Sequence, residues 1–123
     1  MHAWHADWLE ACNSHDLERI RGFLDPGVRR AHLPGGAAAW VGDLAELFHG
    51  FPDWQWKRIQ LVAEDDRIAA HLRGGGTHVG EFRGIAATRR RVNVAEFSML
   101  RIRGGRIVEA TGTEPLELLS QLR

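Results

Sequence analysis

The sequence is poor in several residue types, and each shortage excludes a class of protein. Its 123 residues include a single cysteine, Cys12, so no internal disulfide can form and a reducing cytoplasm fits the composition. The 16 basic and 16 acidic side chains cancel, which leaves no net field to attract nucleic acid or an anionic membrane surface. No apolar run approaches the roughly 20 residues of a membrane-spanning helix. We therefore expect a soluble, cytoplasmic protein that binds neither nucleic acid nor membrane.

The patterns of metal and phosphate sites are also missing. None of the seven histidines stands in a ligand-like spacing with a carboxylate, and there is no second cysteine. The run Gly74-Gly75-Gly76 precedes no predicted helix, so it is not a phosphate loop. The basic run Arg89-Arg90-Arg91 is typical of a solvated turn, with a phosphate or partner contact as the alternative. We expect no metal and no cofactor.

The residues that are present predict one domain, since 123 residues bury one sizeable core and not two. Apolar residues recur at helical spacing in three early segments, at 4–12, 17–24 and 44–51. Alternating patterns then predict strands over 54–57, 67–73, 91–103 and 106–113, with a shorter strand at 28–33 and a last helix that begins at Pro115. Helices followed by a run of strands and a terminal helix indicate the α+β class.

The turn between the last two long strands decides which side chains share a face. Arg103-Gly104-Gly105 fits a three-residue loop in which Gly105 is left-handed and forms a bulge. Residue 102 then pairs with 106, and Ser98 lies opposite Ala110. A two-residue loop, the alternative, pairs 103 with 106 and shifts every partner by one. Because side chains alternate along a strand, one face is predicted to hold Val94, Glu96, Ser98, Leu100, Val108, Ala110, Gly112 and Glu114.

Two stretches resemble one known family. The first is GTHVGEFRGI at 76–85, and the second runs from GRIVE at 105–109 to LELLSQL at 116–122. Both are similar to the pattern of the SnoaL-like polyketide cyclases. The resemblance implies the NTF2-like cone fold over 1–123, in which a curved antiparallel sheet wraps around N-terminal helices and surrounds an apolar pocket. It also implies a homodimer formed through the outer face of the sheet, where Phe97, Met99 and Ile107 are predicted.

The resemblance carries functional positions of NTF2-like enzymes onto Trp8, His32, Glu96, Ser98 and Gly112. Ketosteroid isomerases have a tyrosine at the position of Trp8 and a protonated aspartic acid at the position of Ser98. This sequence has no tyrosine and has serine at 98, so an oxyanion hole of that form is excluded. The polyketide cyclases have a histidine at the position of Ser98 and an acid–base aspartate at the position of Gly112. Both have changed here, and the aldol mechanism of the family lacks its usual acid.

Glu96 and His32 are the candidate catalytic residues. A carboxylate walled by apolar side chains has a raised pKa, which suits it to proton transfer near neutrality. The alternative for Glu96 is a buried ion pair with Arg73 or Arg91. His32 stands where the resembling enzymes have a general base, and histidine titrates near neutrality without a large shift. The alternative for His32 is a surface histidine.

The remaining candidates shape the pocket. The apolar wall is predicted to contain Trp8, Trp40, Phe48, Trp56 and Leu100. Substrate-facing positions are also predicted at His71, Ser98, Gly112 and Glu114. His71 depends on a strand register that the long 74–90 connection hides. His78 belongs to the first family motif, where a purely structural role in the hairpin is the alternative.

Two functions of different class follow from these residues. The first is a cofactor-independent cyclase or isomerase that acts by acid–base catalysis, with His32 and Glu96 as base and acid, on a hydrophobic polyketide- or terpene-like intermediate. An epoxide-opening cyclase or hydrolase is a variant of it, because that chemistry needs only an acid and a positioned nucleophile. The second is a non-catalytic NTF2-like module that binds a ligand or a partner, with Gly112 marking the lost acid.

Overall fold

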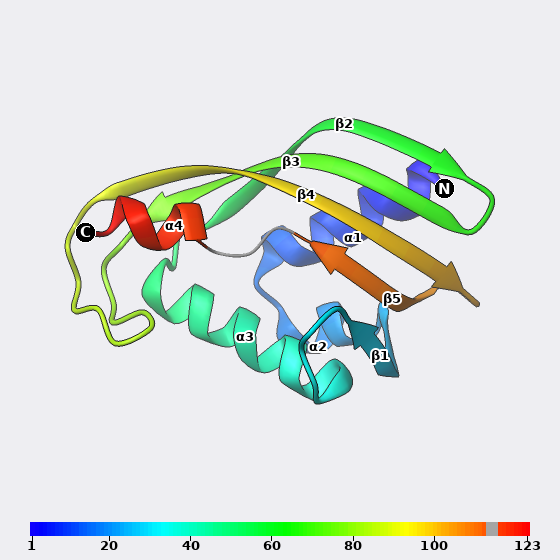
Figure 1. Cartoon of the computed structure of the whole chain (residues 1–123), viewed down its shortest axis with the longest axis horizontal. Coiled ribbons are helices and arrows are strands. Elements are labelled where there is room, and N and C mark those ends of the chain that lie inside the picture. The colour runs from blue at the N-terminus through cyan, green and yellow to red at the C-terminus, as the bar shows by residue number, and fades with distance from the viewer. Residues whose placement is uncertain (113–115) are drawn as a thin grey trace.

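The computed structural model describes residues 1–112 and 116–123, and its elements follow the predicted order of helices, strands and a last helix (Figure 1). The helices are α1 His2–Ser14, α2 Leu17–Arg21, α3 Gly36–Gly50 and α4 Leu116–Gln121. The strands are β1 Leu24–Arg30, β2 Gln55–Glu64, β3 Arg67–Thr77, β4 Arg91–Arg103 and β5 Arg106–Gly112. The predicted start of the last helix at Pro115 falls outside the described residues. No helix in the described part of the chain is long and apolar enough to cross a membrane.

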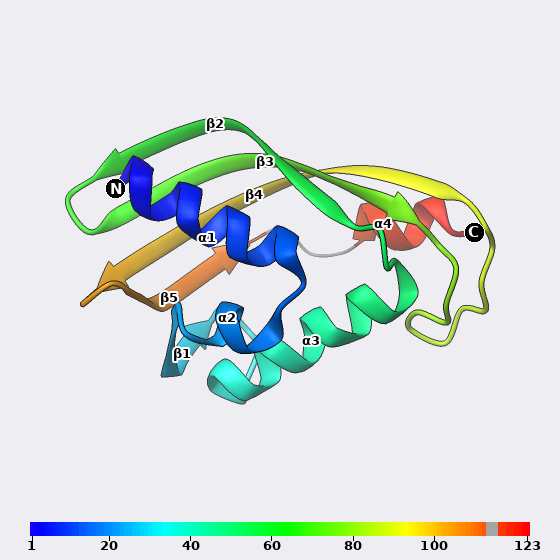
Figure 2. The same ribbon diagram turned by 180° about the vertical axis from the view of Figure 1, so that it is seen from behind.

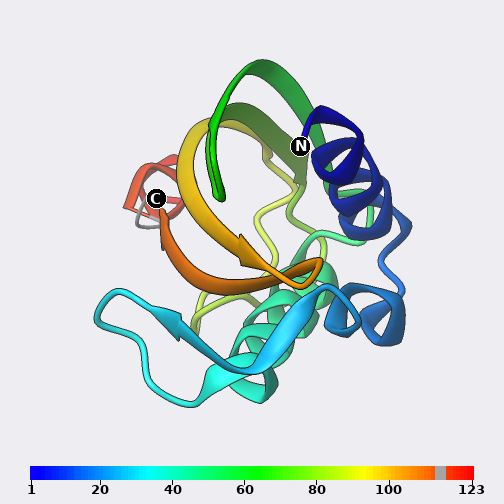
Figure 3. The same ribbon diagram turned by 90° about the vertical axis from the view of Figure 1, so that its right-hand side faces the viewer.

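The strands form one sheet in the order β1-β5-β4-β3-β2. Neighbours from β2 to β5 are antiparallel, whereas β1 runs parallel to β5 and makes the sheet mixed. The sheet arches over α3 and, seen from behind, over α1 (Figure 2). The view along the strands shows the curvature, with the helices α1 and α3 on the concave side (Figure 3). The expected α+β cone is therefore confirmed.

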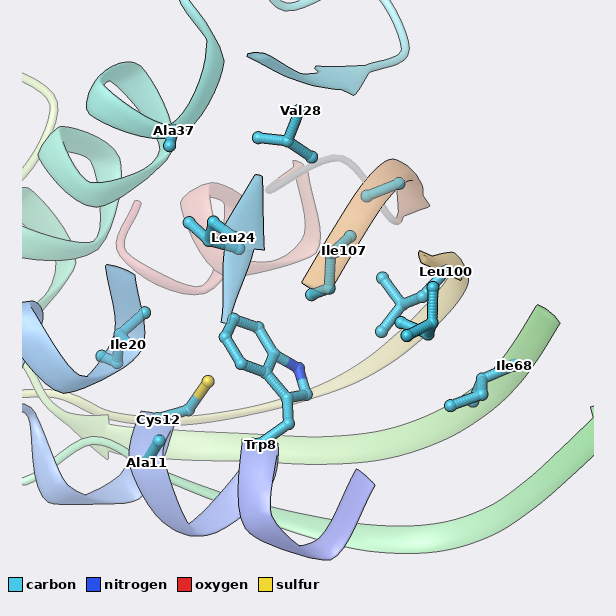
Figure 4. Packing of buried hydrophobic residues seen from close by; sticks show 12 residues of the cluster. Trp8, Ala11, Cys12, Ile20, Leu24, Val28, Ala37, Ile68, Leu100 and Ile107 are labelled. Carbon is cyan, nitrogen blue, oxygen red and sulfur yellow. The ribbon is translucent and has the colours of Figure 1, made fainter. Parts of the chain in front are cut away.

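Two apolar clusters hold the helices against the concave face of the sheet. The larger cluster brings Trp8 of α1 together with Leu24 of β1 and Ile107 of β5 (Figure 4). The smaller cluster lies toward α4 and contains Phe51, Trp54, Phe82, Val92, Val94, Leu118 and Leu122. Each fully buried side chain of this kind contributes about 1.5–3 kcal/mol to folding. Because a cluster stands at each end, the space between them can stay open without loss of the fold.

The glycine run at 74–76 serves the packing of the second cluster. A Cβ on Gly74 would stand 2.7 Å from the ring of Trp54, and one on Gly76 would stand 2.9 Å from the Asp53 carboxylate. Real side-chain carbons do not approach that closely, so a side chain at Gly74 would displace the Trp54 ring. The absence of a side chain there lets Trp54 pack against β3.

The hairpin between β4 and β5 differs from the prediction. Gly104 and Gly105 both have positive φ, 59° and 77°, and form a two-residue turn in which Arg103 pairs with Arg106. The predicted three-residue loop is therefore wrong. A bulge follows at Val108, and beyond it Leu100 pairs with Ala110 and Ser98 with Gly112.

The bulge has a consequence for the faces of the sheet. The two-residue turn and the bulge each shift the pairing of β4 with β5 by one residue relative to the prediction. A total shift of two residues returns each side chain to its predicted face, because side chains alternate along a strand. Ser98, Leu100, Ala110 and Gly112 share the concave face, although Ser98 pairs with Gly112 and not with Ala110. Ile107, which lies between the turn and the bulge, is on the opposite face from the predicted one. It pairs with Ile102 and is 0% exposed, so it belongs to the core and not to the outer surface.

The first family motif has a structural role at His78. Its backbone N–H donates to the carbonyl of Arg90 (2.9 Å), and the backbone N–H of Thr88 donates to its Nδ1 (3.1 Å). The imidazole is 0% exposed and stacks on Phe51 with 5.2 Å between ring centroids. His78 thus closes the 78–90 connection, and the structural alternative proposed for it from the sequence is correct.

The basic run at 89–91 is also structural. Arg90 donates from Nη1 to the carbonyl oxygens of Gln121 (3.3 Å) and Arg123 (2.6 Å), which satisfies the C-terminal end of α4. Arg91 forms an ion pair with Asp53 (3.6 Å). Two of the three arginines therefore hold neighbouring segments of this chain together.

Candidate active site

A cavity of about 410 Å³ lies between the concave face of the sheet and the helices α1 and α3. Pockets of a few hundred Å³ hold small organic molecules, and most are apolar with a few well-placed polar groups. Most of the predicted site residues line this cavity, namely Trp8, His32, Trp40, Trp56, Glu96, Ser98, Leu100 and Gly112. The alternation of β4 and the helical spacing of α1 and α3 bring these residues together from distant parts of the sequence.

Phe48 was predicted in the pocket wall but stands behind it. Its ring packs edge-on against Trp56, with 6.0 Å between centroids, and stacks on His15 at 3.8 Å. Helix α3 turns Leu44 and Leu47 toward the cavity instead. Phe48 is therefore not part of the cavity wall as predicted, and it packs against Trp56 from behind.

His71 was predicted to face the pocket if the strand register allowed it. The register pairs His71 with Phe97, and the two rings stack at 4.5 Å on the outer face of the sheet. His71 therefore lies on the side of the sheet away from Glu96, and the prediction is wrong. Glu114, the last predicted site residue, lies outside the described residues.

Glu96 is the acidic group of the cavity wall on β4. The indole N–H of Trp56 donates to its Oε2 at 2.7 Å. Burial raises the pKa of the Glu96 carboxyl, and the hydrogen bond from Trp56 opposes part of that rise. Within the described residues, no arginine, lysine or histidine lies within ion-pair distance of Glu96. A carboxyl held by one neutral donor in an apolar wall is suited to both bind and release a proton.

The alternative partners considered for Glu96 are engaged elsewhere. Arg73 donates to the side chain of Asn93 (2.8 and 3.1 Å), and Arg91 pairs with Asp53. A buried ion pair of Glu96 with either arginine is therefore excluded. Cys12 lies near Glu96, and burial together with the negative charge of Glu96 raises the pKa of its thiol. The thiol is neutral at physiological pH and is not a nucleophile.

His32 lies at the rim of the same cavity. Strand β1 ends at Arg30, earlier than predicted, and the chain turns so that the backbone N–H of Leu33 donates to the carbonyl of Arg30 (3.1 Å). His32 occupies this turn with a φ of 62°, which non-glycine residues adopt infrequently. Its side chain is exposed and lines the cavity, so both solvent and a bound molecule can reach it.

Sequence reasoning missed Arg30 and Asp43, which form an ion pair at the cavity wall. Nη1 of Arg30 donates to Oδ2 of Asp43 at 2.9 Å, and the guanidinium carbon lies 5.5 Å from the centroid of the Trp40 ring. Both had a signal in the sequence. Arg30 stands two residues after the buried Val28 and so shares its face of β1, and Asp43 shares a helical stripe with Trp40.

Ser98 and Gly112 form a thin part of the wall. They pair across β4 and β5, and both also line a hollow of about 470 Å³ on the outer face of the sheet. No group of three histidine, cysteine, aspartate or glutamate side chains in residues 1–112 and 116–123 is placed to hold a metal ion.

Comparison with known protein families identifies the family of this chain. The model of the SnoaL-like polyketide cyclase family matches residues 3–122 of the chain. The chain belongs to the SnoaL-like polyketide cyclase family. Its helices, its curved sheet and its cavity agree with the cone fold that the resemblance implied. A comparison with curated protein sequences gives no significant match.

Solved structures of SnoaL-like proteins are similar over nearly the whole chain. IdmH from Streptomyces antibioticus, named as a candidate polyketide cyclase, is 30% identical with a TM-score of 0.82, and the match covers 98% of this chain and 96% of IdmH. AclR from Streptomyces galilaeus, named as a candidate hydroxylase, is 28% identical with a TM-score of 0.87, over 98% of this chain and 79% of AclR. TsrD from Streptomyces laurentii shares the fold at 23% identity, with a TM-score of 0.85 over 98% of this chain and 92% of TsrD.

Proposed function

We propose that this SnoaL-like protein is a cofactor-independent cyclase or isomerase, in which Glu96 transfers a proton of a hydrophobic polyketide- or terpene-like intermediate. The observation that carries the proposal is the setting of Glu96. Its carboxyl lies in the cavity wall, bonded to the neutral Trp56 N–H and to no cation among the described residues. A carboxylate in such a setting is a stronger base than one in water, because burial favours its neutral, protonated form.

The chemistry begins at a carbon next to a carbonyl group. Glu96 takes the proton from that carbon, and the electron pair of the broken C–H bond moves onto the carbonyl oxygen as an enolate. In a cyclase the enolate carbon then attacks a second carbonyl of the same molecule, and in an isomerase it accepts a proton at another position. Glu96 returns its proton in either case, so no oxidant or cofactor is consumed.

His32 is proposed as the second proton-transfer group. Its place at the rim gives it access to solvent, whereas Glu96 lies in the wall. Histidine is the side chain that most often serves as a general acid or base, and a bound molecule can reach His32 at the rim. The sequence predicted His32 as the base and Glu96 as the acid, and we propose the reverse order here. In a cyclase His32 protonates the new alkoxide and then recovers a proton from Glu96 through solvent, so one proton is removed and one is returned in each turnover.

The experiment follows the first step alone, on 2-tetralone, a two-ring ketone with an acidic CH₂ beside its carbonyl. Wild-type protein is expected to speed exchange of this CH₂ with D₂O, read by proton NMR. Glu96→Gln is expected to lower that acceleration by on the order of 10²-fold, the usual contribution of one positioned base. Glu109→Gln, which removes a carboxylate bonded to Arg29 and outside the cavity wall, is the matched control and keeps the wild-type rate.

Two results would decide against proton abstraction by Glu96. If Glu96→Gln, with an unchanged circular dichroism spectrum, exchanges 2-tetralone as fast as the wild type, another group is the base. If the wild type binds 2-tetralone yet exchanges it no faster than buffer does, the protein is the ligand-binding module. An epoxide-opening enzyme differs in its pH dependence. It needs Glu96 protonated, so its rate falls with rising pH where the rate of proton abstraction rises.

A further inference from the structure

Arg30 is a cation in the cavity wall that the proton-transfer step above does not use. It is the last residue of β1, and its side chain is only 12% exposed. Within the described residues its guanidinium donates a hydrogen bond to Asp43 alone, through Nη1. A guanidinium carries five N–H donors. Most of the donors of Arg30 are therefore left for a molecule that enters the cavity.

The guanidinium is held in one orientation before any ligand arrives. Asp43 binds one nitrogen at 2.9 Å, and the Trp40 ring lies under the cation at 5.5 Å. Asp43 itself is partly solvated, with 44% of its side chain exposed, so it does not need Arg30 to avoid an unpaired buried charge. The ion pair therefore serves mainly to orient the guanidinium of Arg30, and it is not needed to neutralise a buried charge on Asp43.

The described cavity wall carries two arginines, Arg30 and Arg83, and two carboxylates, Asp43 and Glu96. Arg30 comes from β1 and Glu96 from β4, both line the cavity, and no ion pair joins them. Removal of a proton by Glu96 moves negative charge onto a carbonyl oxygen of the substrate. The residues that form an oxyanion hole in isomerases of this fold are missing, since the chain has no tyrosine and has serine at 98. Of the two arginines in the described wall, Arg83 pairs with Glu46 and is 42% exposed, whereas Arg30 is 12% exposed and keeps most of its donors for a ligand. Arg30 is therefore the arginine placed to meet that charge.

We infer that Arg30 binds the carbonyl oxygen that becomes the enolate, so that the substrate is an enolisable ketone or ester seated with its oxygen at Arg30 and its acidic carbon at Glu96. This inference rests on the proposed function. The proton goes to Glu96 and the negative charge goes to the oxygen bonded to Arg30, so charge is balanced within the cavity. Preorganised donors of this kind are worth about 10²–10³-fold in rate in other enzymes.

The test uses 2-naphthol, whose anion has the shape and charge of a two-ring enolate, and 2-methoxynaphthalene, which has nearly the same shape and cannot ionise. Binding is measured by fluorescence at a pH at which free 2-naphthol is ionised. Wild-type protein is expected to bind the naphtholate at least about tenfold more tightly, since a hydrogen bond to a charged group contributes about 1.5–3 kcal/mol. Arg30→Gln is expected to abolish this preference and leave the affinity for 2-methoxynaphthalene within about twofold.

The controls separate this site from general effects of charge or folding. Arg101→Gln removes an arginine of similar ion pairing, to Asp66 and Glu109, outside the cavity wall, and is expected to keep the preference. If Arg30→Gln alone does not fold, the double variant Arg30→Gln, Asp43→Asn removes both charges of the pair. An equal loss of affinity for the two ligands, or a wild type with no preference for naphtholate, overturns the inference.

Glu96→Gln in the same titration distinguishes this inference from the proposed function. It is expected to bind naphtholate more tightly than the wild type, because a like charge in the cavity is removed. If Arg30→Gln loses the preference and Glu96→Gln leaves it unchanged, Glu96 does not face the ligand and the proposed proton transfer fails while the Arg30 site stands. If Glu96→Gln loses tetralone exchange and Arg30→Gln keeps the preference for naphtholate, the inference about Arg30 is wrong and the proposed function stands.

Discussion

In the proposed reaction, the hydrogen bond from Trp56 to Glu96 controls the pH at which Glu96 can accept a proton. Trp56→Phe keeps an aromatic ring between Phe48 and Trp54 and deletes the N–H that reaches Oε2 at 2.7 Å. The bond favours the charged carboxylate, so its loss raises the pKa of Glu96 above the value that burial already gives it. A hydrogen bond to a charged group is worth about 1.5–3 kcal/mol, so its loss disfavours the carboxylate by an energy of that order.

The assay is the pH dependence of tetralone exchange, together with a direct titration of the carboxyl by carbon-13 NMR. Glu96 acts as a base only when charged, so the rising limb of the rate profile is expected to move to higher pH. The variant loses rate near neutrality and regains it in alkali. Trp8→Phe is the matched control, because it shortens another indole of the same wall that is not bonded to Glu96. This variant is expected to leave the pH midpoint of the rate profile unchanged, even if it changes the rate itself.

Two results would contradict this reasoning, each at a different step. If the NMR titration shows the carboxyl of Glu96 moving to higher pH in Trp56→Phe while the rate profile does not move, then Glu96 is not the group whose ionisation limits the reaction. If neither moves, the hydrogen bond does not stabilise the carboxylate in solution, and the account given for the pKa of Glu96 is wrong.

Two further predictions concern stability and assembly. His5 is 1% exposed beside Arg58, and burial lowers its pKa from 6.5 to about 4, so the unfolded chain binds a proton that the folded one does not as pH falls from 6.5 to about 4. In urea titrations, the free energy of unfolding of the wild type is expected to fall by roughly 3 kcal/mol over that range, and that of His5→Leu is expected to fall less. An equal fall in both proteins would mean that His5 is already charged in the native state. The outer face of the sheet exposes Ile59, Val62, Phe97 and Met99, and we propose that it pairs with a second copy of the chain. Met99→Glu is then expected to halve the mass in analytical ultracentrifugation, whereas a monomeric wild type at micromolar concentration would contradict the dimer.

Local patterns in the sequence were sufficient for the order of the elements and for the place of Glu96. The apolar stripe around Trp8 predicted α1, and the alternation of β4 placed Glu96 on the same face as Leu100. These features depend on periodicity within one segment, which side-chain geometry ties directly to helix or strand. The motif around His78 led to the correct family by resemblance, although the structure assigns that histidine to the hairpin.

The pairing of β4 with β5 could not be read from the sequence. Two adjacent glycines at 104 and 105 allow either turn, because glycine adopts positive φ without strain. The bulge at Val108 then restored the faces that the wrong turn had predicted, so the side of Ser98 came out correctly with the wrong partner. Ile107, between the two irregularities, was placed on the wrong side for the same reason.

The sequence by itself determined a SnoaL-like α+β chain with a carboxylate on the inner face of its sheet. Only the tertiary structure decided which groups meet that carboxylate. Trp56 reaches Glu96 across 40 residues of sequence, Arg30 joins Asp43 from another element, and His71 faces outward because β3 pairs in one register. Such contacts depend on where whole elements come to rest against one another, and that is set by the packing of the core and not by any local pattern.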